Sequence, residues 1–228
     1  MIVIIGLIPA RGGSKGIPRK NLVCLGDKTL LEIGVDKLFM SGCDEVFVST
    51  DDQEISECAR KYGAKVISRP DEISEDTSST EPVILHAINS VKMDPSDTLV
   101  IHQITSPMIT VKSIVFCIKS IENSKFNSAV SVFQEFPFIW VENEFQEWEP
   151  NNHKRASRPR RQDLAKSGIE TGGIYVAKVK AVIEQLNRFP APTICVPVGY
   201  IEAIDINTKS DLDDVRKLFK EINEKKSG

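Results

Sequence analysis

The sequence lacks the marks of several protein classes. Its five cysteines are an odd number and include no Cys-x-x-Cys pair, which argues against a disulfide framework and against a zinc ribbon. No apolar run approaches the ~20 residues that a membrane span needs. Acidic residues outnumber basic ones, and the formal net charge of −3 argues against a general nucleic-acid binder. We therefore expect a protein that binds neither membranes nor nucleic acids.

Signatures of targeting and of familiar catalytic groups are also missing. The three histidines have no metal-ligand spacing, and no Ser/His/Asp or Cys/His arrangement stands out. The opening residues, MIVIIGLIPA, are apolar but have no basic lead, so they predict a buried strand and not a signal peptide. These absences favour a cytoplasmic protein.

Apolar β-rich runs alternate with amphipathic helical stretches along most of the 228 residues. Expected strands cover residues 2–8, 45–49, 64–68, 99–103, 128–133, 173–177, 194–198 and 201–206. Expected helices cover residues 30–40, 52–62, 81–92, 111–121, 179–186 and 210–223. This alternation predicts an α/β fold, a single domain over residues 1–228 whose mostly parallel sheet carries helices on both faces.

The alternation breaks between about residues 134 and 168, which we interpret as an insertion. Its large aromatic side chains are too many for an exposed surface loop, and they predict a homodimer interface. These side chains are Phe136, Phe138, Trp140, Phe145 and Trp148. A basic run, KRASRPRRQ, follows at residues 154–162. Because the run is short and lies in an acidic insertion, it favours closure over an anionic small ligand, or contact with a partner subunit, above a nucleic-acid arm.

The first predicted strand is followed by the segment PARGGSKGIPRKN, residues 9–21, where ligands of parallel sheets bind. Four of the ten residues 11–20 are basic and none is acidic: Arg11, Lys15, Arg19 and Lys20. Ser14 adds a hydroxyl donor among glycines that let backbone N–H groups approach a ligand: Gly12, Gly13 and Gly16. The segment matches neither a Walker loop nor G-x-G-x-x-G. It predicts a nest for several negative charges, such as a triphosphate.

Acidic residues at two other strand ends have different interpretations. Asp205 and Asn207 end the last expected strand two residues apart, so their side chains share a face and offer oxygen ligands to Mg²⁺. The alternative is that Asn207 or Thr208 caps the helix near residue 210. After the second strand, Asp51 or Asp52 is predicted to cap the next helix.

Several motifs together carry a resemblance to a known family. IPARGGSKGIPRKNL (residues 8–22) resembles the signature of the acylneuraminate cytidylyltransferases, the CMP-sialic acid synthetase family. RPDEISEDTSST (69–80), HQITSP (102–107), RRQDL (160–164), GGIYV (172–176) and AIDINTKSDL (203–212) follow in that family's order. The resemblance implies a Rossmann-like nucleotidyltransferase fold and a homodimer whose insertion reaches the neighbouring active site. It also implies a reaction in which CTP and a 2-keto-3-deoxy sugar acid give a CMP-sugar and pyrophosphate.

The resemblance assigns roles to particular residues. The nucleotide loop includes Arg11, Gly13, Ser14, Lys15, Lys20 and Asn21, with further nucleotide contacts from Arg69 and Thr80. Arg11 and Lys20 are the expected catalytic cations at the α-phosphate and the departing pyrophosphate. The expected sugar contacts are Gln103, Arg161 and Gln162. Asp205, with Asn207 beside it, is the expected catalytic carboxylate and Mg²⁺ site.

Most departures from the family pattern lie at positions near the sugar acid, the expected acceptor of CMP. Asn207 replaces a second carboxylate, Ile109 replaces a basic residue, and Thr171 replaces an Asn before Gly172. Ile139-Trp140 occupy the region where sialic-acid members have a Lys. The expected acceptor is therefore sialic acid or a related nonulosonic acid. Two alternatives stay open: the same fold with another nucleotide or sugar acid, and a nucleotide-sugar-binding protein that has lost catalysis.

Overall fold

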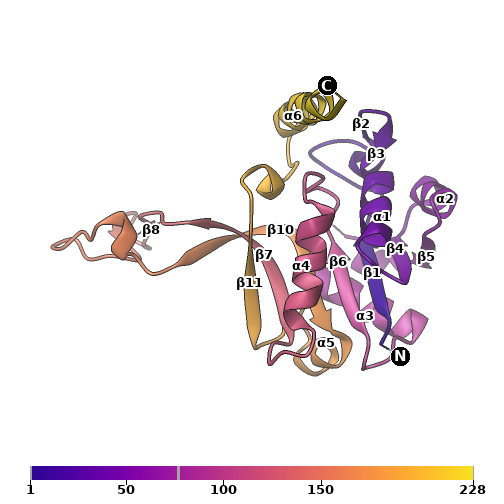
Figure 1. Cartoon of the computed structure of the whole chain (residues 1–228), viewed down its shortest axis with the longest axis horizontal. Coiled ribbons are helices and arrows are strands. Elements are labelled where there is room, and N and C mark those ends of the chain that lie inside the picture. Colours follow the sequence, from indigo (N-terminus) through magenta and orange to yellow (C-terminus); the bar gives the residue numbers. More distant parts are fainter. Residues whose placement is uncertain (1, 76–77, 228) are drawn as a thin grey trace.

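The computed structural model describes residues 2–75 and 78–227, and in them a seven-stranded sheet forms the centre, in the order β11-β7-β10-β6-β1-β4-β5 (Figure 1). The strands are β1 (Ile4–Pro9), β4 (Glu45–Thr50), β5 (Lys65–Ser68), β6 (Thr98–His102), β7 (Ser128–Glu135), β10 (Ser167–Lys178) and β11 (Thr193–Val198). Neighbours pair in parallel except at β10, which runs antiparallel to both β6 and β7. The predicted mostly parallel sheet is confirmed.

Helices cover both faces of this sheet, as the alternating pattern predicts. One face packs against α1 (Leu30–Met40), α2 (Gln53–Lys61), α4 (Val111–Ile121) and α6 (Lys209–Ser227). The other face packs against α3 (Thr80–Val91) and α5 (Val179–Gln185). Side chains of β1 divide between the two cores, with Ile8 in one and Leu7 in the other, because successive strand residues point to opposite faces. Among the helices of the described residues, none combines the length and apolar character needed to span a bilayer.

Short elements complete the chain between these helices and strands. Single 3₁₀ turns are η1 (Lys20–Leu22), η2 (Asp71–Ile73), η3 (Arg161–Asp163) and η4 (Ile201–Ala203). Two small ribbons pair β2 (Cys24–Leu25) with β3 (Lys28–Thr29), and β8 (Trp140–Glu142) with β9 (Trp148–Pro150).

Two expected strands differ from the structure. The strand expected at 173–177 is the end of the longer β10, which begins inside the expected insertion and pairs with β7 from Ser167↔Glu135 onward. The strand expected at 201–206 is wrong: residues 201–203 form η4, and residues 204–208 are irregular. Ile206 has no strand neighbour, because its N–H donates to the Thr105 carbonyl (2.8 Å) and its carbonyl accepts from Lys20 Nζ (3.0 Å).

The expected insertion forms an arm that projects from the sheet (Figure 1). The outer ends of β7 and β10 make its base, and the β8–β9 ribbon lies farther out. Of its five Phe and Trp rings, Phe136 and Phe138 are half-buried in this chain, whereas Trp140, Phe145 and Trp148 are exposed, with exposed fractions of 74% for Phe145 and 56% for Trp148.

Candidate active site

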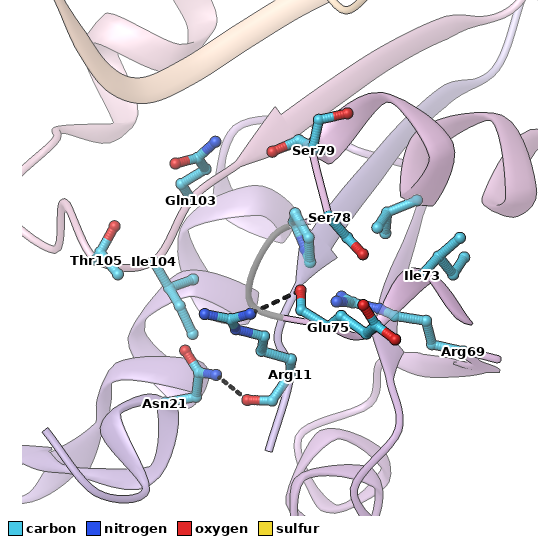
Figure 2. A pocket seen from close by; sticks show the side chains of 13 residues that line it. Arg11, Asn21, Arg69, Ile73, Glu75, Ser78, Ser79, Gln103, Ile104 and Thr105 are labelled. Atoms are coloured by element: carbon cyan, nitrogen blue, oxygen red, sulfur yellow. Dashed lines mark hydrogen bonds between the residues drawn. The ribbon is translucent and has the colours of Figure 1, made fainter. Parts of the chain in front are cut away.

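A cleft of about 280 Å³ opens at the carboxyl ends of β1 and β6 (Figure 2). Residues from five parts of the chain line it: Pro9, Arg11, Asn21, Arg69, Ile73, Glu75, Ser78, Ser79, Thr80, Val83, Gln103, Ile104 and Thr105. A ligand site at this edge of a parallel sheet agrees with the general rule for such folds. Five of the residues selected from the sequence line this cleft: Arg11, Asn21, Arg69, Thr80 and Gln103.

Arg11 is held at the floor of the cleft from both its side chain and its backbone. Its Nη1 donates to the Glu75 carbonyl (2.9 Å), and its own carbonyl accepts from Asn21 Nδ2 (2.8 Å) (Figure 2). Asn21 is buried in the first turn after the glycine segment. Asn21 therefore fixes the backbone that carries the Arg11 guanidinium.

Arg69 brings a second guanidinium to the cleft, and it is buried. Its Nη2 donates to the Ser49 carbonyl (2.7 Å) and its Nε to Ser49 Oγ (3.2 Å). Burial, together with the charge of Arg11, lowers the pKa of Arg69 to about 10 against the opposing effect of Asp51. Two mutually repelling cations line one cleft, so an anionic ligand between them would be stabilised.

The glycine segment lies beside this cleft and packs closely on two other loops. A Cβ on Gly12 would lie 2.7 Å from Asp52 Oδ2, and one on Gly16 would lie 2.4 Å from the Asn207 carbonyl oxygen. Nothing lies within 4 Å of a Cβ on Gly13. Gly12 and Gly16 are therefore required by packing, whereas Gly13 leaves the backbone open to a ligand.

The cations and polar groups of this segment do not all face the cleft. Arg19 turns away and pairs with Asp52 (2.5 Å) and with Glu54. Asp52 caps α2 by accepting from the Ile55 N–H (2.9 Å), which confirms the predicted cap. Ser14 and the exposed Lys15 lie on the part of the segment outside the cleft lining. The Gly12 N–H donates to Asp51 Oδ1 (2.9 Å), so an internal carboxylate already occupies one amide of the nest.

Lys20 links the glycine segment to the irregular segment that carries Asp205. Burial lowers the pKa of Lys20, the negative charge of Asp205 opposes that effect, and the positive charge of Arg11 adds to it. The Lys20 ammonium donates to the Ile206 carbonyl (3.0 Å), between the two residues selected as metal ligands. Arg11, Lys20 and Asp205 therefore form one electrostatic group.

Asp205 and Asn207 lie together although they are not on a strand. Asn207 Nδ2 donates to Asp205 Oδ2 (2.9 Å), and Ser106 Oγ donates to Asp205 Oδ1 (3.4 Å). The cap of α6 is a different residue: Thr208 Oγ1 accepts from the Asp211 N–H (3.3 Å), and Asp211 accepts from the Thr208 N–H in return (2.7 Å). The alternative of a helix cap at Asn207 or Thr208 is thus confirmed for Thr208 and wrong for Asn207, whose side chain is directed at Asp205.

The donor set at Asp205 decides whether a cation fits there. Within residues 2–75 and 78–227, no group of three or more His, Cys, Asp or Glu side chains could hold a metal ion. One carboxylate and one neutral amide remain, and the amide nitrogen faces the carboxylate. Such a site suits Mg²⁺ only when substrate phosphates supply further oxygens, which is the usual manner of Mg²⁺ binding.

Arg161 and Gln162 lie on the arm, away from the cleft. Both are exposed on η3, and Arg161 Nε donates to the Phe136 carbonyl (3.3 Å). Neither residue lines the cleft of its own chain, so within one chain these two residues do not join the other site residues.

Other residues at the site were not selected from the sequence. Ser79 precedes α3, and Ile104 and Thr105 follow β6, where only their position after an expected strand is a signal. His102, directly before Gln103, is completely buried, and burial beside Lys37 lowers its pKa to about 3. His102 is therefore neutral at physiological pH and supports the turn that carries Gln103.

The sequence is similar to those of known cytidylyltransferases. A family model described as cytidylyltransferase matches residues 5–175. N-acylneuraminate cytidylyltransferase B of Danio rerio is 38% identical over 181 residues, which are 77% of this chain and 42% of that protein. The chain thus spans less than half the length of that relative. Pseudaminic acid cytidylyltransferase of Campylobacter jejuni is 32% identical over 225 residues, covering 94% of this chain and 95% of that protein.

Solved structures share the fold at lower sequence identity. A CMP:2-keto-3-deoxy-manno-octonic acid synthetase complexed with CTP is similar with a TM-score of 0.68 at 20% identity, covering 96% of this chain and 99% of that one. A 4-diphosphocytidyl-2C-methyl-D-erythritol synthase from Anaerococcus prevotii is similar with a TM-score of 0.66 at 15% identity, covering 96% and 99%. At these identities the likeness concerns the fold alone.

Proposed function

The chain belongs to the cytidylyltransferase family, and we propose that it transfers CMP from CTP to the anomeric hydroxyl of a 2-keto-3-deoxy sugar acid, releasing pyrophosphate. The acceptor class is sialic acid or a related nonulosonic acid, the kind of substrate named for its relatives. The observation that carries the proposal is that Arg11 and Arg69 line one strand-end cleft, while Lys20 interacts electrostatically with both Arg11 and Asp205. A triphosphate is the substrate whose charge matches this group.

In this reaction the hydroxyl oxygen forms a bond to the α-phosphorus, and the bond from that phosphorus to the bridging oxygen of pyrophosphate breaks. Negative charge develops on the phosphoryl oxygens and on the leaving group. Cations that are already in place stabilise that charge without reorganisation. Asn21 and Glu75 hold Arg11, and the Ile206 carbonyl holds Lys20, so both cations have the fixed positions that this role requires.

Mg²⁺ is the proposed cofactor, with Asp205 as its carboxylate and Asn207 as an accompanying amide. Bound together with the triphosphate, Mg²⁺ supplies charge neutralisation on the phosphate oxygens. Ser106 and Asn207 hold both oxygens of Asp205 by hydrogen bonds, and this supports a fixed orientation of the carboxylate. Direct coordination by Asn207 needs its amide to turn, because the nitrogen is the atom that faces Asp205.

The acceptor side of the proposal involves Gln103 and a second copy of the chain. Gln103 Oε1 lies 3.8 Å from where a Cβ on Gly172 would be, so β10 approaches this side chain closely. We propose that the arm of one protomer carries Arg161 and Gln162 to the cleft of the other. The exposed rings of Phe145 and Trp148, on the same arm, support its burial in a homodimer.

The reaction is proposed to occur in the cytoplasm. All five cysteines are free thiols, and two of them are buried. Free thiols are typical of proteins in a reducing compartment.

Pyrophosphate release tests the function and its alternatives together. CTP, UTP, ATP and GTP are each incubated with the protein, Mg²⁺ and a panel of sialic, pseudaminic and 2-keto-3-deoxyoctonic acids. Release with CTP and one or more nonulosonic acids is the expected result. Release with another nucleotide, or only with another sugar acid, would show that the assigned nucleotide or sugar acid is wrong.

A binding protein without catalysis is the second candidate, and the neutral Asn207 beside Asp205 is the observation that favours it. Calorimetry with CTP and with CMP-sugars distinguishes it. Binding of either ligand with no pyrophosphate release from any combination would support this candidate and contradict the enzyme.

A further inference from the structure

Asp205 lies in a segment that has almost no regular structure. Residues 199–208 connect β11 to α6 and contain only the short turn η4. Hydrogen bonds close that turn on itself, from the Ala203 N–H to the Gly199 carbonyl (3.2 Å) and from the Ile204 N–H to the Ile201 carbonyl (3.4 Å). Contacts outside the turn must therefore decide where Asp205 lies.

The side chain of Glu202 provides such a contact. Its Oε1 accepts from the Thr110 N–H (2.9 Å) and from Ser113 Oγ (2.6 Å), at the first turn of α4. Its Oε2 accepts from the Gly199 N–H (3.1 Å) at the start of its own turn. Both oxygens are used, so this one carboxylate joins η4 to α4.

The charge of Glu202 suits this location. Burial alone would raise the pKa of this half-buried carboxyl, but hydrogen bonds from Ser113, Thr110 and Gly199 lower it below its ordinary value. The N-terminus of a helix also favours a negative charge. Glu202 is thus ionised and firmly held at neutral pH.

A second contact joins the same two segments at their other end. The Ile206 N–H donates to the Thr105 carbonyl (2.8 Å), and Ser106 Oγ donates to Asp205 Oδ1 (3.4 Å). Residues 105–110 and 199–206 are therefore tied at both ends, by Glu202 at Thr110 and by Ile206 at Thr105. Asp205 lies directly beside the second tie.

We propose that Glu202 is a positioning residue, which fixes η4 against α4 so that the Asp205 carboxylate stays in place beside Ser106. The inference rests on the proposed function, because it assigns Asp205 to the divalent cation that accompanies CTP. Ile206 is completely buried and gives the segment a separate apolar anchor. Loss of Glu202 is therefore expected to misplace Asp205 without unfolding the protein.

The test measures cation binding and not turnover. Mn²⁺ binding in the presence of CTP is followed by electron paramagnetic resonance for the unmodified chain, Glu202→Ala and Glu202→Gln. Glu202→Ala should weaken Mn²⁺ binding about tenfold, the lower end of the cost of losing an outer-shell partner of a metal site. Glu202→Gln should weaken it less, because the amide oxygen still accepts from Thr110 and Ser113.

Controls separate positioning from a general loss of structure. Glu122→Gln changes an exposed carboxylate at the other end of α4 and should leave Mn²⁺ binding unchanged. CTP binding without a divalent cation should be equal in all variants, whereas hydrogen exchange in residues 203–207 should rise in Glu202→Ala.

The outcomes distinguish failure of the inference from failure of the proposed function. Equal Mn²⁺ binding by Glu202→Ala and the unmodified chain would overturn it, whatever happens to the melting temperature. Equal weakening of CTP binding with and without Mn²⁺ would also overturn it, because the defect would then be structural. No Mn²⁺ binding with CTP by the unmodified chain would instead contradict the proposed function, and the inference would fall with it.

Discussion

Replacing Asn207 with Asp tests most directly how the charge of residue 207 affects the proposed cation site. Asn207 Nδ2 now donates to Asp205 Oδ2 across 2.9 Å, so Asn207→Asp turns an attractive contact into a pair of facing carboxylates. At 2.9 Å and a dielectric constant of about 80, two unit charges repel by about 1.4 kcal/mol. The exposed position of Asn207 justifies the dielectric constant of water.

This repulsion predicts opposite effects without and with the cation. The unliganded variant should melt a few degrees lower, since about 1 kcal/mol shifts the melting temperature by about 2–4 °C in a chain of this size. A divalent cation relieves the repulsion. The Mg²⁺ concentration for half-maximal pyrophosphate release should therefore fall by about tenfold, the equivalent of about 1.4 kcal/mol.

Differential scanning fluorimetry and a Mg²⁺ titration of pyrophosphate release measure the two effects. Asp213→Asn, on the exposed face of α6, is a control that changes charge away from the site. An unchanged Mg²⁺ dependence for Asn207→Asp would refute the reasoning, and would mean that Asp205 holds the cation without help from residue 207.

Three further predictions concern other parts of the site. Arg11→Ala and Lys20→Ala should each lower the turnover number by about 10²-fold or more with an unchanged melting temperature, since each removes a preorganised cation; turnover within about threefold of the unmodified chain would contradict these roles. Gly16→Ala should weaken CTP binding measured by calorimetry and lower the melting temperature, because its Cβ would lie 2.4 Å from a backbone carbonyl oxygen, whereas Gly13→Ala, with nothing within 4 Å, should leave the melting temperature unchanged. Sedimentation should show a dimer at micromolar concentration, and deletion of residues 139–151 from the arm should give a monomer; a monomeric full chain would refute the interface.

Much of the sheet could be predicted because its strands are apolar runs between helices. Runs such as Ile4–Pro9 and Thr98–His102 are buried on both faces, so they are mostly apolar, and their short length indicates strands and not helices. The direction in which the strands pair could not be predicted in this way. The sequence of β10 contains nothing that distinguishes a parallel from an antiparallel neighbour, and its direction follows from the arm that returns the chain to the sheet.

The position of the cleft was predictable because one segment after β1 carries the glycines and cations. Glycines and cations directly after β1 indicate a phosphate site, and the cleft lies there. Which cations face the ligand depends on carboxylates elsewhere in the chain: Arg19 turns toward Asp52 and Glu54, and no local pattern shows this. Glu202 has no motif either, because its partners at Thr110 and Ser113 are about 90 residues away in sequence.

The segment at 201–206 shows why a strand pattern failed. Its residues are mostly apolar and suit a strand, but Ile206 satisfies its backbone groups through Thr105 and Lys20. The local pattern cannot show that these distant partners replace a neighbouring strand.

Following the label from CTP tests the central claim most directly. The protein is incubated with Mg²⁺, a nonulosonic acid and CTP carrying radioactive phosphorus at either the α- or the γ-phosphate. We expect the α-label in a CMP-sugar and the γ-label in pyrophosphate. Transfer of the γ-label to the sugar, or no label on the sugar with any acceptor of the panel, would contradict the account.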